Sequence, residues 1–115
     1  MSGRSSETGA RPRIVVAVHG PALARSLAAA LERAGFDPVV VHDNEAAGRA
    51  IQAGPCEGLV GDARATRLDG LVLTDLALRA SPWACVVIRT TPAARPVALE
   101  AVRRGAYEFL SATED

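Results

Sequence analysis

Three short apolar segments of the chain end in residues whose side chains can do chemistry. One segment ends at Asp62, an earlier one ends at His19, and a later one ends at Arg89 and Thr90. A carboxylate, an imidazole, a guanidinium and a hydroxyl are groups that proteins use to bind metals, move protons or bind phosphoryl groups. His19 and Asp62 are only two candidate ligands, and a metal site requires three or four. The sequence therefore predicts no metal and no cofactor at these residues.

Charge and composition exclude several classes of function. The chain has 13 basic residues, all of them arginine, and 13 acidic residues, so no net field favours nucleic acid or an anionic membrane surface. Aromatic residues are 3% of the chain, which argues against base stacking. No apolar run approaches the roughly 20 residues that cross a bilayer, and no signal segment opens the chain. We expect a cytoplasmic protein in which Cys56 and Cys85 are small buried hydrophobic residues.

Apolar runs and turn residues divide the chain into alternating strands and helices. Strands are predicted at 14–18, 39–41, 58–61, 84–88 and 107–110. Helices are predicted from Pro21 to a stop at Gly35, over 45–53 after a cap at Asp43 or Asn44, from Gly70 to Ser81, and over 96–104. Residues 1–12 are polar and are expected to form a flexible tail, and residues 13–115 are expected to form one domain.

The strict alternation of strand and helix predicts a parallel sheet with helices on both faces. In such sheets ligands bind outside the carboxyl ends of the strands. The residues at those ends are Val18 with His19, Asp62, Arg89 with Thr90, and Ser111 with Ala112. No Gly-x-Gly-x-x-Gly motif follows the first strand, so dinucleotide binding has no support.

Three segments of the chain resemble bacterial response-regulator receiver domains. Residues 13–36, RIVVAVHGPALARSLAAALERAGF, are similar to the family's opening strand and helix. Asp62, followed seven residues later by Asp69-Gly70-Leu71, is similar to its phosphoacceptor and the motif after it. Residues 101–110, AVRRGAYEFL, are similar to a late segment of the family. The resemblance implies a flavodoxin-like (CheY-like) doubly wound fold with a five-stranded parallel sheet in the order 2-1-3-4-5.

The resemblance also implies roles for single residues. Asp62 is at the position of the phosphoacceptor, and Thr90 and Phe109 are at the two switch positions of the family. Without a phosphoryl group to attract the threonine, we expect a fixed hydroxyl at Thr90 and a packed ring at Phe109.

Other family positions have been replaced in this chain. Val18 and His19 are at the positions of the acidic pair that holds Mg²⁺, Ala112 is at the position of the lysine, and Thr66 and Thr113 are at two proline positions. Valine cannot ligate Mg²⁺, and histidine prefers softer metals. Each lost electrostatic contact is commonly worth about 3 kcal/mol of barrier or more. The replacements therefore indicate that Asp62 is a vestigial phosphoacceptor without a bound metal.

Several side chains near these positions have two interpretations. The His19 imidazole is either a transition-metal ligand with Asp62 or, as we favour, a hydrogen-bond donor to that carboxylate. Arg89 either pairs with Asp62 in place of a metal or faces solvent. Trp83 is expected to be a partly buried loop residue, and His42 has no special role.

These observations predict a degenerate receiver domain that is not an enzyme. It would act in two-component-type signal transduction as a phosphorylation-independent module that binds a protein partner or a fused output domain. The alternatives are a receiver that is phosphorylated on Asp62, and a small-ligand sensor that uses the crevice between the first and third strands.

The resemblance raises a question about the surface beside the first helix. Receiver domains have a fifth helix after the last strand, and this chain stops at Asp115, where that helix would begin. Either the chain is a fragment of a longer protein or another chain covers this face. We expect a homodimer formed through Leu23, Leu27, Leu31 and the apolar residues of the last two strands.

Overall fold

The computed structural model describes residues 11–63 and 69–111, and these contain all the predicted strands and helices. The strands are β1 (Arg13–Ala17), β2 (Asp37–Val40), β3 (Gly58–Asp62), β4 (Cys85–Thr90) and β5 (Glu108–Ser111). The helices are α2 (Pro21–Arg33), α3 (Asn44–Gln52), α4 (Gly70–Ala80) and α5 (Arg95–Arg103), and a short 3-10 turn, η1 (Pro92–Ala94), precedes α5. The predicted tail 1–12 lies mostly outside the described residues.

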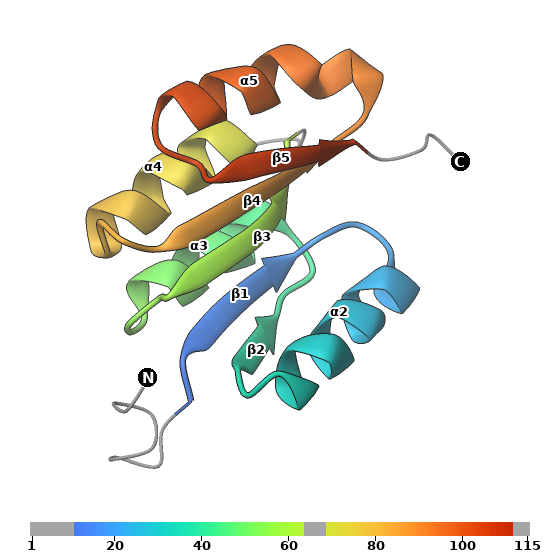
Figure 1. The fold of residues 1–115 in the computed structure, drawn as a ribbon, viewed down its shortest axis with the longest axis vertical. Helices are drawn as coiled ribbons and strands as arrows, with labels where there is room; N and C mark the ends of the chain where they lie inside the picture. The colour runs from blue at the N-terminus through green and yellow to red at the C-terminus, as the bar shows by residue number, and fades with distance from the viewer. Residues whose placement is uncertain (1–10, 64–68, 112–115) are drawn as a thin grey trace.

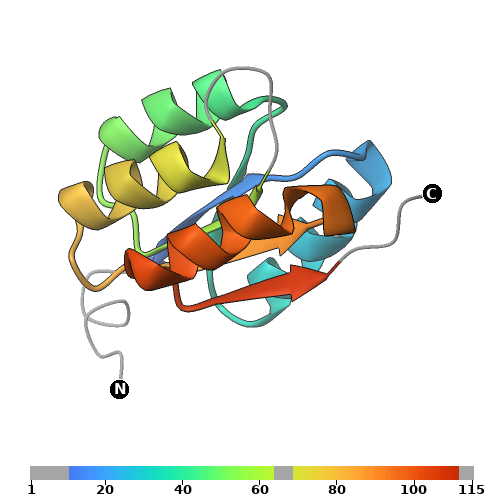
Figure 2. The same ribbon diagram turned by 90° about the horizontal axis from the view of Figure 1, so that it is seen from above.

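The five strands form one sheet in the order β2-β1-β3-β4-β5, and every pair is parallel, as predicted. Figure 1 shows the strands running in one direction, so that their carboxyl ends share one edge of the sheet. In the view from above, α3, α4 and α5 cover one face of the sheet and α2 lies on the other (Figure 2). This arrangement confirms the predicted doubly wound α/β fold.

The two faces of the sheet bury hydrophobic clusters of different size. The larger cluster packs α3, α4 and α5 against residues such as Val15, Leu59 and Val86, each with no exposed surface. The smaller cluster packs α2 against Ile14, Val16 and Val18. Successive strand residues point to opposite faces, so the central strands must be apolar on both.

Short polar side chains and glycines set the helix boundaries. Asp43 caps α3 by accepting a hydrogen bond from the amide of Ala46 at 2.7 Å, which decides between the two predicted caps. Gly35, with φ 97°, follows α2 in the left-handed region that glycine tolerates. Most predicted limits differ from the observed ones by one or two residues, and the largest differences are at the start of β2, which begins at Asp37, and at the end of β4, which continues through Arg89 and Thr90.

Three expectations about exposure were wrong. The Trp83 residue is 84% exposed rather than partly buried. Cys85 is exposed, and only Cys56 is the buried thiol that was predicted for both. The α2 leucines are half-buried against β1, so they do not form a bare surface. Among the described residues, no helix is long and apolar enough to cross a bilayer.

Candidate functional site at the carboxyl ends of β1, β3 and β4

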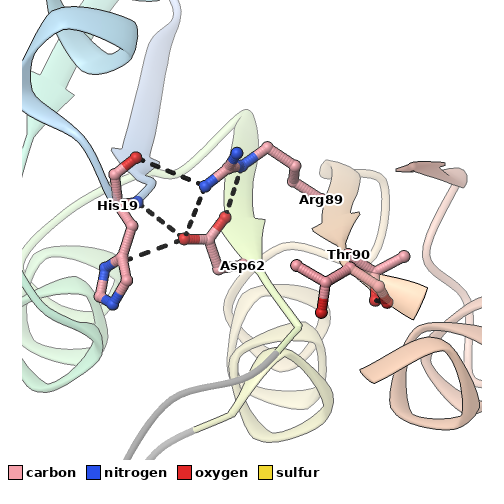
Figure 3. Close-up of polar contacts among 5 residues, drawn as sticks. His19, Asp62, Arg89 and Thr90 are labelled. Carbon is pink, nitrogen blue, oxygen red and sulfur yellow. Dashed lines mark hydrogen bonds and ion pairs between the residues drawn. The ribbon is translucent and has the colours of Figure 1, made fainter. Parts of the chain in front are cut away.

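The parallel register brings the sequence-predicted residues together. β1 and β4 both pair with β3, so the ends of these three strands are neighbours. Asp62 is the last residue of β3 and is in register with Arg89 of β4. His19 follows β1 after Val18. Figure 3 shows His19 and Arg89 on either side of the Asp62 carboxylate.

Both oxygens of the Asp62 carboxylate accept hydrogen bonds. Arg89 donates from Nε to Oδ1 at 2.8 Å and from Nη2 to Oδ2 at 3.3 Å. The backbone amide of His19 donates to Oδ2 at 2.7 Å. Arg89 Nη2 also lies 3.4 Å from the carbonyl oxygen of His19, so one guanidinium contacts β3 and the residue after β1. The side chains of Asp62 and Arg89 are 12% and 27% exposed, so water screens this pair only in part.

The structure decides between the two interpretations of Arg89. The guanidinium is bound to the carboxylate in a two-point geometry and does not face solvent freely. Such charge-assisted pairs are stronger and more directional than neutral hydrogen bonds. Arg89 therefore supplies positive charge directly beside Asp62.

The prediction that the His19 imidazole donates to Asp62 was wrong. The ring Nδ1 lies 4.0 Å from Asp62 Oδ2, beyond hydrogen-bond distance, and the side chain is 79% exposed. The backbone amide of the same residue makes the contact instead. Every residue type except proline carries this donor, so the identity of the side chain could not have indicated it.

Val18, Thr90 and Phe109 form no hydrogen bond with the carboxylate, whose polar partners are His19 and Arg89. Val18 is buried in the α2 cluster, and Phe109 packs half-buried against the cluster on the opposite face. Thr90 is 3% exposed, and its hydroxyl donates to the carbonyl oxygen of Thr91 at 2.8 Å. The hydroxyl therefore already has an acceptor. The replaced positions Thr66, Ala112 and Thr113 lie outside the described residues.

The Asp69-Gly70 motif has a structural explanation in this chain. Asp69 caps α4 by accepting a hydrogen bond from the amide of Val72 at 3.0 Å. A Cβ atom on Gly70 would lie 2.9 Å from the Cα atom of Ala63 and 3.0 Å from the carbonyl oxygen of Asp62. Only glycine permits this close approach of α4 to the end of β3, so the motif fixes the backbone beside Asp62.

The residues present do not fit the divalent metal that receiver domains use. Within residues 11–63 and 69–111, no group of three or more His, Cys, Asp or Glu side chains is placed to hold a metal ion. Val18 is aliphatic, the His19 ring Nδ1 lies 4.0 Å from Asp62 Oδ2, and the carboxylate oxygens already have three donors. A metal would have to displace a cation that the chain itself provides.

Solved structures of receiver domains have the same fold as this chain. A response regulator receiver domain protein from Clostridium thermocellum is 19% identical, with a TM-score of 0.75 over 87% of this chain and 81% of that one. Full-length FixJ from B. japonicum is 29% identical, with a TM-score of 0.72 over 87% of this chain and 49% of that one. The chain thus has the CheY-like fold of the receiver domains of two-component response regulators.

A third structure with this fold contains a modified aspartate. It is a response regulator from Burkholderia pseudomallei, solved with a phosphorylated aspartic acid, a calcium ion and citrate. It is 24% identical, with a TM-score of 0.73 over 90% of this chain and 61% of that one. No protein-family model and no curated protein sequence matches the chain.

Proposed function

We propose that the chain is a pseudo-receiver, a signalling module that binds a protein partner without phosphorylation of Asp62. The observation that carries this proposal is the ion pair between Asp62 and Arg89, with Nε and Oδ1 at 2.8 Å. The module is not an enzyme in this proposal, and its output depends on the partner or on a fused domain.

The ion pair opposes phosphorylation for two physical reasons. A carboxylate attacks a phosphoryl group through a free oxygen lone pair, and three donors already hold the two oxygens of Asp62. The transition state also needs cations on the phosphoryl oxygens, and catalysis of this transfer is almost wholly electrostatic. Arg89 is a single cation whose donors are directed at Asp62 itself. The sequence has no lysine to add another.

A phosphodonor experiment tests the proposal. The chain is incubated with acetyl phosphate and Mg²⁺, or with beryllofluoride and Mg²⁺, and its intact mass and amide spectrum are recorded. We expect no mass gain and no amide shifts around Asp62. A stoichiometric mass gain that disappears in Asp62→Asn contradicts the proposal and supports the alternative, a receiver phosphorylated on Asp62.

The Arg89→Gln variant is the matched control for this experiment. It removes the cation that holds the carboxylate and leaves the other residues of the site in place. A small increase in labelling of this variant over the parent chain supports the role assigned to the ion pair. Equal labelling of the two proteins contradicts that role.

The remaining alternative is a small-ligand sensor with its site between β1 and β3. A thermal-shift screen tests it, because a ligand at 100 times its Kd adds about 2.7 kcal/mol to the free energy of unfolding. The structure places the backbone of His19 against Asp62 across this crevice, at 2.7 Å between N and Oδ2. Together with the two donors of Arg89, this contact engages both oxygens of the carboxylate, which favours the pseudo-receiver.

For the partner, we propose a second copy of the chain on the face of the sheet that carries α2. α2 packs on β1 and β2, and Figure 1 shows no described helix over β4 and β5 on that side. Leu110 is 50% exposed there, and Cys85, at the start of the neighbouring strand β4, is also exposed. A closed two-fold dimer is the commonest way to cover such a face.

A further inference from the structure

The face of the sheet that carries α2 has a covered half and an open half. α2 packs on β1 and β2, whereas no described helix lies over β4 and β5 on this face (Figure 1). Neighbouring strands are about 4.8 Å apart, so the distance from β3 to β5 is about 10 Å. A helix with its side chains is about 10–12 Å across. The open half therefore has room for one helix.

The strands of the open half present one unpaired charge among apolar and thiol side chains. Val86 and Phe109 pack into the larger cluster on the opposite face, so their strand neighbours point to the open half. These neighbours, from the carboxyl ends of the strands toward their amino ends, are Leu110, then Val87 and Glu108 in one row, then Cys85. The charged residues of β3, β4 and β5 are Asp62, Arg89 and Glu108. Asp62 and Arg89 neutralise each other, and Glu108 is exposed and has no ion pair with a described residue.

The outer surface of α2 has a complementary pattern. Ala22, Arg25 and Ala29 are three and four residues apart, so they form one line along the helix. This line is on the opposite side of α2 from Leu27, which packs in the smaller cluster against β1. Arg25 is exposed and has no ion pair with a described residue, and the other charged residues of α2 are in its last turn, Glu32 and Arg33. A single cation between two small side chains therefore faces away from the sheet.

α2 begins level with the last row of the open half. Leu110 is in register with Arg89, and Arg89 is in register with Asp62. The amide of His19, two residues before α2, donates to Asp62 at 2.7 Å. From this level α2 runs back toward the amino ends of the strands (Figure 1).

Distances from this level match between the helix and the strands. At about 1.5 Å per residue, Arg25 lies about 6 Å and Ala29 about 12 Å from the start of α2. At about 3.3 Å per residue, Glu108 lies about 7 Å and Cys85 about 13 Å from the row of Leu110. The unpaired cation and the unpaired carboxylate are therefore at the same depth, and so are Ala29 and Cys85.

We infer that the proposed second copy places its α2 over β4 and β5 of the first, so that each copy fills the open half of the other. The two-fold axis of this dimer is parallel to the strands, so every residue keeps its depth. Arg25 of one copy then faces Glu108 of the other, and Ala29 faces Cys85. An axis across the strands would instead stack the two α2 helices on each other and leave both open halves uncovered. The inference rests on the second copy that is proposed as the partner.

Charge reversal tests the contact between Arg25 and Glu108. Because the contact occurs twice in the dimer, Arg25→Glu and Glu108→Arg should each raise its dissociation constant about fivefold or more, measured by sedimentation equilibrium. The double variant, with the two charges exchanged, should return to within about twofold of the parent chain. Arg79→Glu is the matched control, because Arg79 is exposed on α4 across the sheet, and it should associate like the parent.

A cross-link tests the depth of α2 in the open half. Cys85 is exposed and Cys56 is buried, so a short bismaleimide reacts with one native thiol of the folded chain. Ala29→Cys should give a covalent dimer, and adding Cys85→Ser to that variant should abolish it. Leu99→Cys is the control, because Leu99 is exposed on α5 across the sheet, and it should give no covalent dimer.

Failure of this arrangement can be distinguished from failure of the dimer. The arrangement alone is overturned if the parent chain dimerises and Leu110→Glu weakens the dimer, but the double charge variant is not restored or Ala29→Cys gives no more covalent dimer than Leu99→Cys. A parent chain that stays monomeric overturns both the arrangement and the second copy as partner. Phosphorylation of Asp62 is tested separately by the phosphodonor experiment.

Discussion

A guanidinium that contacts both oxygens of a mostly buried carboxylate is favourable only while both groups are present. In this chain the pair is Arg89 and Asp62, and the amide of His19 completes it. Removing one partner leaves the other poorly solvated, which usually costs more than the net energy of the intact pair. Hydrogen bonds from these few residues therefore join the ends of β1, β3 and β4.

The Arg89→Gln substitution should lower the free energy of unfolding by about 1–3 kcal/mol, because it leaves the Asp62 carboxylate with the amide of His19 as its main donor. Urea unfolding measures the change. Arg25→Gln, at an exposed position on α2, should stay within about 0.5 kcal/mol of the parent protein. The double variant with Asp62→Asn should lose less than the sum of the single losses. Additive losses would show that the two side chains do not interact in solution.

The two cysteines should differ in reactivity and in their effect on stability. Cys85 is exposed and Cys56 is 1% exposed, so a thiol reagent should label one site quickly and the other only after unfolding. Burial raises the pKa of the Cys56 thiol above its ordinary value of 9.0. Above about pH 9 the unfolded thiol therefore loses its proton before the folded one does, and the free energy of unfolding falls as the pH rises.

The Cys56→Ala variant is the control for this pH dependence. Its stability should fall less steeply above pH 9 than that of the parent protein, in thermal melts recorded at several pH values. A parallel decline in the two proteins contradicts the assignment to Cys56. Rapid labelling of both thiols in the folded chain contradicts the burial.

At the scale of elements, the turns after α2 and α5 can be compared directly. Gly35 and Gly105 both have positive φ, at 97° and 119°, but only a Cβ on Gly105 meets another atom, Leu78 Cδ1 at 2.7 Å. Alanine at Gly35 should cost about 1 kcal/mol from backbone conformation alone. Alanine at Gly105 should cost more, about 2–3 kcal/mol in total, because Leu78 must also move. Equal losses in chemical unfolding would show that Leu78 moves without cost.

The same elements show how far the sequence predicts the structure. The strand order follows from the alternating pattern and the resemblance, and Gly35 marks the end of α2 in both the sequence and the structure. The end of β4 was missed because an apolar run does not include polar residues, even where, like Thr90, they are buried. Arg89 and Thr90 are polar, yet they extend β4. The last pair of residues in register between β3 and β4 is Asp62 and Arg89. Pairing of this kind depends on the neighbouring strand, which periodicity does not describe.

Part of the candidate site could likewise be predicted from the sequence, and part of it could not. The types and spacing of Asp62, Arg89 and Thr90 placed all three at one sheet edge, which the register confirms for Asp62 and Arg89. The contact from His19 could not be predicted, because it uses the backbone. The exposure of Trp83 was missed because its sequence neighbours, Pro82 and Ala84, do not indicate what packs against the loop.

At the scale of the whole molecule, the two faces of the sheet are covered unequally. Within residues 11–63 and 69–111, three helices cover one face, and α2 covers the β1 and β2 side of the other (Figures 1 and 2). Val86 and Phe109 point into the larger cluster, so Cys85, Val87 and Leu110 face the side of α2. This part of the sheet is the surface that the proposed second copy would cover.

The dimer proposal predicts a concentration-dependent association that a charge at Leu110 disrupts. Burying apolar area contributes about 25 cal/mol per Å², which must exceed the cost of association. Because Leu110 is 50% exposed, Leu110→Glu should weaken the dimer without opening the core, whereas Leu27→Glu would disturb the packing of α2.

Sedimentation equilibrium of the parent chain, Leu110→Glu and the control Leu99→Glu measures this association. The control residue is 45% exposed on α5, across the sheet, and that variant should still dimerise. A parent chain that stays monomeric at tens of micromolar, or equal association of all three proteins, rules out a dimer through this face.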